Sequence, residues 1–165
     1  MKAIETLYNK VLYRSRLEAR WAVYFDALNI KHEYEPEGYT YGGMRYLPDF
    51  YLSNLYYRSS VSEKVYVEIK PSSYDKEEIK SSNWFDKPLF LFKGIPIATP
   101  MFECWSICWD QDMKIYKCDK CGSTKIDYGF DKSYCNFCDG GCDYDIISKA
   151  EETALSYRFL EWYTF

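Results

Sequence analysis

Two closely spaced cysteine pairs place the strongest constraint on the fold of this chain. Both pairs read Cys-x-x-Cys, and 13 residues separate them; the four residues are Cys118, Cys121, Cys135 and Cys138. Four thiolates from two tight turns form the closed tetrahedral site that structural Zn²⁺ prefers, with no open position for catalysis. We therefore predict a four-cysteine zinc ribbon, in which Cys142 is an alternative to Cys138 as the fourth ligand.

The distribution of cysteines and of apolar residues bears on the compartment. Five of the seven cysteines lie between Cys118 and Cys142, which is unlike a disulfide framework spread over a secreted domain. The sequence has no run of about eighteen apolar residues, the length that a membrane span needs. Its first residues also lack the apolar segment of a signal peptide. We expect a cytoplasmic protein with no membrane partner.

Composition and charge limit the classes of function. The 165 residues are 47% hydrophobic and 28% charged, which is typical of a globular chain, but 20% are aromatic. A formal net charge of −4 excludes a polycationic nucleic-acid coat. The charge is uneven, because residues 1–100 hold 14 basic and 13 acidic groups whereas residues 101–165 hold 7 and 12. The negative charge therefore belongs mainly to the cysteine-rich end.

Hydrophobic periodicity predicts a mixed α/β fold built around one β-sheet and flanked by helices. A helix over residues 15–28 begins with a Ser15–Glu18 capping box, and a second helix over residues 148–163 begins with one at Ser148. A short helix is expected over residues 73–84. Strands are expected at residues 31–35, 39–41, 44–52, 64–70, 89–92, 104–109 and 113–116.

The same patterns predict the division of the chain. We expect a core over residues 1–116, a zinc-ribbon insertion over residues 117–146, and a C-terminal helix over residues 147–165 that packs back on the core.

Three charged side chains on two predicted strands carry the candidate chemistry. Strand alternation puts Glu68 and Lys70 on one face, and Asp49 lies across from Glu68 if the two strands are adjacent and antiparallel. Carboxylate oxygens suit Mg²⁺ or Mn²⁺, which can activate water and neutralise charge developing on phosphorus. The structural alternative is that Asp49 follows a turn-forming proline and that Glu68 and Lys70 form a solvated strand face.

These residues lie in segments that resemble a nuclease family. Tyr46-Leu47-Pro48-Asp49 and Val67-Glu68-Ile69-Lys70 resemble the motif of the PD-(D/E)XK nuclease superfamily. Arg14-Ser15-Arg16-Leu17-Glu18-Ala19-Arg20-Trp21-Ala22 and Tyr34-Glu35-Pro36-Glu37 are similar to small phage-encoded members, which are related to the endonuclease subunit of certain transposases. The resemblance covers roughly residues 12–95.

The resemblance implies a restriction-endonuclease-like core and metal-dependent cleavage of DNA in the cytoplasm of a phage host. Its catalytic residues would be Asp49, Glu68 and Lys70, with Asp49 and Glu68 holding Mg²⁺ or Mn²⁺. It also implies that Glu18 points at the metal site. The alternative for Glu18 is that its side chain only caps the first helix.

Four arginines are candidate contacts to DNA phosphates. Arg14 and Arg16 flank the start of the first predicted helix, where the helix dipole attracts anions, and Arg20 follows one turn later. Arg45 lies near the proposed catalytic strands. A solvated helix face is the ordinary alternative for such charges. Many relatives cut two strands as homodimers, but no dimer seam is visible in the sequence.

A second class of function competes with cleavage. A phage interaction protein that kept the nuclease fold could act as an adaptor or as an inhibitor of a host protein, through its aromatic and acidic surface. An acidic mimic of DNA is a poor third possibility, because a net charge of −4 is small for that role.

Overall fold

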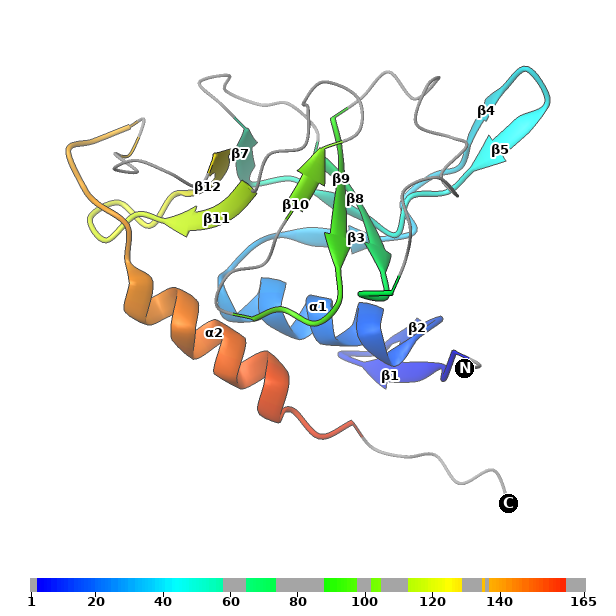
Figure 1. The fold of residues 1–165 in the computed structure, drawn as a ribbon, viewed down its shortest axis with the longest axis horizontal. Helices are drawn as coiled ribbons and strands as arrows, with labels where there is room; N and C mark the ends of the chain where they lie inside the picture. Colours follow the sequence, from blue (N-terminus) through cyan, green and yellow to red (C-terminus); the bar gives the residue numbers. More distant parts are fainter. Residues whose placement is uncertain are drawn as a thin grey trace.

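The computed structural model describes residues 3–57, 65–73, 88–97, 102–104, 113–128, 135 and 137–159. Its main feature is an eight-stranded sheet with two helices beside it (Figure 1). In spatial order the strands are β3 (His32–Tyr34), β6 (Phe50–Leu52), β8 (Val65–Lys70), β9 (Leu89–Lys93), β10 (Phe102–Cys104), β11 (Met113–Lys117), β12 (Thr124–Tyr128) and β7 (Leu55–Tyr57).

Two small hairpins and two helices complete the described part of the chain. The hairpins pair β1 (Thr6–Tyr8) with β2 (Val11–Tyr13), and β4 (Tyr39–Tyr41) with β5 (Met44–Tyr46). The helices are α1 (Arg16–Ala27) and α2 (Tyr144–Ser156). The large sheet is mixed, because β8 pairs with β9 and β12 with β7 in parallel, whereas its other neighbours are antiparallel. The predicted mixed α/β class is thus confirmed.

Helix α1 forms where the periodicity predicts it. Ser15 is its N-cap and accepts a hydrogen bond from the backbone N–H of Glu18 at 3.2 Å. Trp21 and Phe25 are completely buried and pack on Phe92 of β9, with ring centroids 4.8 and 6.2 Å away. The indole N–H of Trp21 also donates to the carbonyl of Gly94 at 2.8 Å. These contacts fix the start of α1 relative to the central strands.

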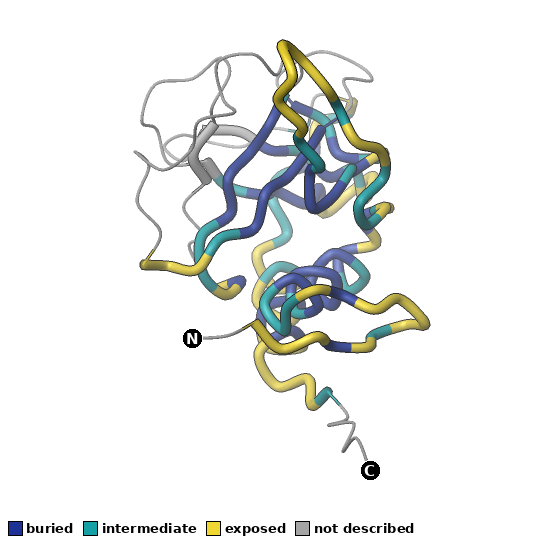
Figure 2. Tube along the Cα trace, turned by 90° about the vertical axis from the view of Figure 1, so that its right-hand side faces the viewer, coloured by how far each residue is buried: buried dark blue, intermediate teal, exposed yellow. Residues whose placement is uncertain are grey.

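Strand β8 is the centre of the sheet that carries the candidate site. Its residues from Val65 to Ile69 are all buried, and they include the carboxylate-bearing Glu68 (Figure 2). Val67 and Ile69 belong to the core cluster that includes α1, whereas Tyr66 belongs to a second cluster with Leu89. Because side chains alternate, Glu68 and Lys70 share the second face with Tyr66.

The expected strand over residues 44–52 is two strands in the structure. Leu47 and Pro48 interrupt it, since proline has no N–H to contribute to a ladder. The first part, β5, turns back on β4 through Gly42 and Gly43, and the second part, β6, joins the large sheet. Asp49 therefore stands at the entrance of β6, directly after the break.

The second long helix begins and ends earlier in the chain than its sequence pattern predicts. It begins at Tyr144, four residues before the expected start, because Asp143 caps it and accepts from the N–H of Ile146 at 2.9 Å. Ser148 is therefore inside α2, and the expected capping box there is wrong. Helix α2 ends at Ser156, before the expected residue 163.

Several expected elements extend beyond what is described, and some observed ones were not expected. The expected helix at 73–84 and strand at 104–109 fall mostly on residues outside the described ranges. The β1–β2 hairpin, β7 and β12 were not predicted.

The cysteine-rich segment is continuous with the sheet. The expected boundary between residues 116 and 117 falls inside β11, and β12 pairs with β7 from the first third of the chain. Lys117 at the end of β11 is buried, and its Nζ donates to the carbonyl of Leu28 at 2.7 Å. Leu28 is the C-cap of α1. Strand pairing and this bond tie the segment to the core.

Within the described ranges, neither helix has the length and apolarity that crossing a membrane requires.

Candidate functional site

The antiparallel pairing of β6 and β8 brings two carboxylates together. Phe50 pairs with Val67, so the register continued by one residue places Asp49 opposite Glu68 and on the same face of the sheet. Asp49 is 3% exposed and Glu68 is 7% exposed. Burying two carboxylates side by side is costly unless donors or cations compensate them.

Asp49 receives one neutral and one charged donor. The backbone N–H of Ile69 donates to its Oδ2 at 2.7 Å, and Nη2 of Arg14 donates to its Oδ1 at 2.7 Å. Burial, followed by the negative charge of Glu68, nevertheless raises the pKa of Asp49 to about 7, and Glu18 adds to this effect. The bond from Ile69 and the charge of Lys70 act in the opposite direction. The surroundings of Asp49, burial first and then the neighbouring charge of Glu68, therefore disfavour its ionised form, which a further cation would stabilise.

Glu68 is held by two side chains from the same face. The hydroxyl of Tyr46 donates to its Oε2 at 2.8 Å, and Lys70 donates to its Oε1 through Nζ. Lys70 thus stands beside Glu68, as strand alternation predicts. Tyr46 comes from the end of β5, so the break at Pro48 positions both Tyr46 and Asp49 against β8.

Glu18 is bonded to the N-cap residue of α1 and also belongs to the carboxylate network. Its Oε1 accepts from the hydroxyl of Ser15 at 2.7 Å, and its Oε2 accepts from the hydroxyl of Tyr34 at 2.5 Å. The Tyr34 oxygen in turn accepts from the backbone N–H of Arg14 at 2.9 Å. Through Tyr34 and Arg14, Glu18 is connected to Asp49. Glu18 thus contacts both the N-cap residue of α1 and the network around Asp49, and its role at a metal site stays a prediction.

The four candidate DNA-contacting arginines lie in three different places. Arg14 is half-exposed but engaged with carboxylates, because its Nε also pairs with Glu35 at 2.6 Å. Arg20 donates to the carbonyls of Ala154 and Leu155 at the end of α2, the second at 2.8 Å. Arg16 and Arg20 line an open groove of about 560 Å³ beside α2. Arg45 is exposed on β5.

The Asp49–Glu68 pair has the donor chemistry for a hard divalent cation. An ionised carboxylate offers about four acceptor positions. Each of the four oxygens accepts one described hydrogen bond, which leaves further lone pairs for coordination. Mg²⁺ binds to one or two carboxylates while keeping several waters. Among the residues that the structure describes, Glu18 does not join them in a tight three-carboxylate cage.

The four predicted cysteines form one cluster. Their Sγ atoms all lie within 4.8 Å of one another, and Cys118–Cys138 and Cys121–Cys135 are 3.5 and 3.4 Å apart. In a tetrahedral Zn²⁺ site with bonds of about 2.3 Å the sulfurs would be about 3.8 Å apart. Backbone N–H groups also point at the sulfurs: Lys120 and Cys121 donate to Cys118, Phe137 donates to Cys135, and Gly140 donates to Cys138, each at 3.4 Å. The cluster can hold a metal ion.

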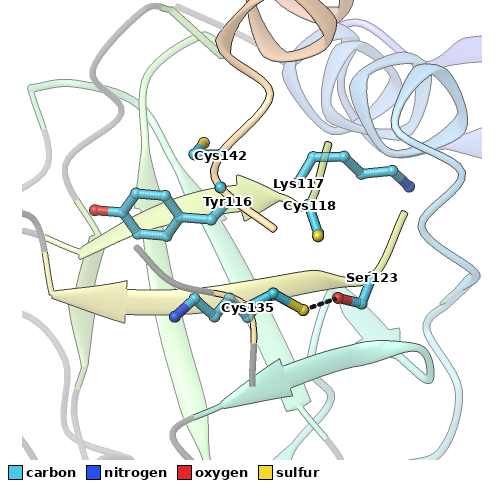
Figure 3. A pocket seen from close by; sticks show the side chains of 8 residues that line it. Tyr116, Lys117, Cys118, Ser123, Cys135 and Cys142 are labelled. Carbon is cyan, nitrogen blue, oxygen red and sulfur yellow. Dashed lines mark hydrogen bonds between the residues drawn. The ribbon is translucent and has the colours of Figure 1, made fainter. Parts of the chain in front are cut away.

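The cysteine spacing leaves open whether Cys138 or Cys142 completes the group of four, and the structure distinguishes the two. Cys138, not Cys142, is the fourth member of the cluster. The backbone of Cys142 forms an isolated bridge with Cys118, and its side chain lines a small pocket together with Cys118 and Cys135 (Figure 3). In Figure 3 the thiol of Cys142 points away from those two sulfurs.

Gly140 is required by the packing of the second cysteine turn. A Cβ atom at this position would lie 2.6 Å from Sγ of Cys118 and 2.7 Å from Oδ1 of Asp119. At neighbouring Gly141 the nearest atom would be 3.5 Å away. Gly140 therefore allows the two cysteine turns to approach each other closely.

Two tyrosines of the site were not identified from the sequence. Tyr34 connects Glu18 with Arg14, and Tyr46 holds Glu68. Both lie inside the segments that carry the family resemblance, so the signal was present, but only the acidic and basic residues of those segments were interpreted.

A search of family models, curated proteins and solved structures finds no match to this chain.

Proposed function

We propose that this protein is a metal-dependent DNA endonuclease that hydrolyses phosphodiester bonds at Asp49, Glu68 and Lys70. The observation that carries the proposal is the pair of buried carboxylates on β6 and β8, with an amine beside them on the same face. The mixed sheet with α1 packed against it supports the resemblance to the PD-(D/E)XK superfamily. In this proposal the enzyme acts on DNA in the cytoplasm, as a monomer or as a homodimer.

In this proposal each charged side chain of the site has a separate role, which follows from its chemistry. Asp49 and Glu68 would hold Mg²⁺ or Mn²⁺, which when bound lowers the pKa of water and neutralises charge on the phosphate. Lys70, next to Glu68, would orient the attacking water or stabilise the charge that develops on phosphorus. Glu18 would position the site through Tyr34 and Arg14. Arg14 would exchange its bond with Asp49 for a contact to the substrate when the cation binds.

The four-cysteine cluster supports a second part of the proposal, a structural Zn²⁺. A Zn²⁺ ion held by all four thiolates in tetrahedral geometry would have no ligand position left for substrate. Because β12 and Lys117 connect this segment to the core, the ion would stabilise the whole fold and take no part in cleavage.

Plasmid cleavage tests the proposed reaction. The unsubstituted protein is expected to nick or linearise supercoiled DNA with Mg²⁺ or Mn²⁺, and Asp49→Asn and Lys70→Ala are expected to lower the rate at least about 100-fold. Asp145→Asn, at an exposed carboxylate of α2, is the matched control and should retain full activity. Equal activity in all four proteins would overturn the proposal.

A second function, a non-cleaving interaction protein with a nuclease-like core, is favoured by one specific observation. Arg14 and Lys70 already pair with Asp49 and Glu68, so the chain itself compensates the carboxylates. In that case Mn²⁺ would not raise the melting temperature, and a stable phage or host protein would be recovered with the unsubstituted protein. Stabilisation by Mn²⁺ that disappears in Asp49→Asn would favour the endonuclease.

A further inference from the structure

The β4–β5 hairpin projects from the large sheet beside the candidate site (Figure 1). Its six strand residues pair from Tyr39–Tyr46 at the base to Tyr41–Met44 at the tip. Gly42 and Gly43 form the turn with φ of 56° and 82°, a conformation that glycine adopts without strain. Every residue from 40 to 45 is exposed (Figure 2). The hairpin is therefore an arm with an ordered turn and two solvent-facing sides.

The base of this arm is anchored to the strand that carries Glu68. The hydroxyl of Tyr46 donates to Glu68 at 2.8 Å. On the opposite strand, the hydroxyl oxygens of Tyr39 and Tyr66 are 2.7 Å apart, and their rings meet edge to face at 5.8 Å. The arm is thus fixed at its base against β8, one residue to either side of Val67.

The tip has the composition of a surface that contacts nucleic acid. Tyr41 is 63% exposed and Met44 is 45% exposed, and the two form a cross-strand pair. Arg45 is the only charged residue between Gly38 and Tyr46. Aromatic faces stack on bases of any sequence, apolar side chains such as methionine insert between base steps, and arginine pairs with phosphate. The positive charge and the absence of acidic residues from this segment favour an anionic partner over a basic one, and the exposed aromatic ring favours one with bases to stack on.

From this combination we infer that the β4–β5 hairpin is a nucleic-acid contact arm, in which Tyr41 and Met44 contact bases and Arg45 contacts a phosphate. The inference rests on the proposed function and adds where the substrate lies. From Tyr46 to Gly43 the arm extends about 10 Å at about 3.4 Å per residue. That distance equals about three nucleotide steps along one strand of duplex DNA, so an arm that follows the strand reaches bases about three positions from the phosphate at the proposed metal site.

Binding without turnover tests the arm separately from cleavage. The affinity of a fluorescein-labelled duplex and of one of its single strands is measured by anisotropy, with Ca²⁺ in place of Mg²⁺. Tyr41→Ala is expected to weaken binding by about 5-fold to 150-fold, the range for loss of one stacked base, whereas Tyr41→Phe keeps the ring and the affinity. Arg45→Ala is expected to reduce the slope of log affinity against log salt by about one, which Tyr41→Ala leaves unchanged.

Two exposed residues of α2 serve as matched controls: Tyr144→Ala, at a side chain that is 67% exposed, and Lys149→Ala. Both should bind like the unsubstituted protein. If the unsubstituted protein binds DNA and the Tyr41→Ala/Met44→Ala double variant binds it equally well, the inference that the hairpin contacts nucleic acid is overturned and the endonuclease proposal stands. If the unsubstituted protein binds neither form of DNA, both proposals are overturned.

Discussion

Nη2 of Arg14 lies 2.7 Å from Oδ1 of Asp49, although 35 positions separate the two residues in the sequence. The contact joins the start of α1 to the entrance of β6 and places a positive charge where the resemblance implies a metal. Arg14 is half-exposed, whereas Asp49 is 3% exposed. The arginine can therefore move into solvent more easily than the carboxylate can.

Removing this guanidinium should make the protein less stable and more responsive to divalent cations. Arg14→Ala leaves the buried Asp49 without its charged partner, which we expect to cost about 1–3 kcal/mol in the free energy of unfolding. Mn²⁺ should then raise the melting temperature of the variant by more than it raises that of the unsubstituted protein. Arg45→Ala, at an exposed site, is the control and should change neither quantity. Identical Mn²⁺ responses of the Arg14 variant and the unsubstituted protein would show that the arginine does not occupy the cation's place.

The raised pKa of Asp49 predicts a specific dependence of stability on pH. The folded-state pKa is about 7 against an ordinary value of 3.8, so the folded protein binds the proton more tightly than the unfolded chain does. The associated stability is fully present below the ordinary pKa and is lost as pH rises toward 7. Asp49→Asn does not titrate, so its stability relative to the unsubstituted protein should increase between about pH 5 and about pH 7.5. Urea unfolding of both proteins across this range measures the difference, and a constant difference would contradict the raised pKa.

Metal content distinguishes the four clustered cysteines from Cys142. Cys118→Ser removes a member of the tetrahedral group and should abolish stoichiometric zinc and lower the melting temperature, because metal binding to such a site contributes folding free energy. Cys142→Ser should retain one zinc per chain. Atomic absorption on the purified proteins measures the difference. Equal zinc in both variants would mean that Cys142 can act as a ligand.

Two alanine substitutions at neighbouring glycines of the second cysteine turn test how closely the two cysteine turns pack. Gly140→Ala forces a Cβ to within 2.6 Å of Cys118 Sγ, whereas Gly141→Ala meets its nearest atom at 3.5 Å. The first substitution should lower zinc affinity and destabilise the protein by about 1–3 kcal/mol through overpacking, and the second should be nearly neutral. Competition with a chromogenic zinc chelator reports the affinity. A neutral Gly140→Ala would show that the two turns are less closely packed than described.

Lys117 should be important for stability although it lies far from both carboxylates. Its buried ammonium donates to the carbonyl of Leu28 at the end of α1 and to Oγ1 of Thr124 at 3.2 Å. Lys117→Met keeps the length of the side chain but leaves these acceptors without their donor, which should cost about 1–3 kcal/mol. Lys114→Met on the same strand is less buried and should cost much less. Equal losses would mean that the bond to Leu28 contributes nothing.

The sequence predicted the elements whose signals are local. Ser15 and the apolar spacing that follows it identify α1, and the apolar run ending at Pro71 identifies β8. The turn at Gly42 and Gly43 identifies the hairpin. The β1–β2 hairpin was missed because its turn uses Asn9 and Lys10 at φ of 47° and 67°, without a glycine.

The site could be predicted only in part, for a related reason. The facing of Asp49 and Glu68 follows from strand register, and the cysteine cluster follows from spacing. The partners of Arg14 and Lys117 depend on how α1 packs against β6 and β11, which is not a local property. The helix dipole attracts anions to the start of α1, but it does not indicate that Arg14 meets Asp49 and Glu35, which come from other parts of the chain.

Anomalous diffraction from crystals soaked in Mn²⁺ shows whether the two carboxylates bind a divalent cation. We predict a Mn²⁺ peak with oxygens of both Asp49 and Glu68 at about 2.1 Å and with Arg14 withdrawn from Asp49. No peak at a saturating concentration, with Arg14 and Lys70 still bonded to the two carboxylates, would contradict it.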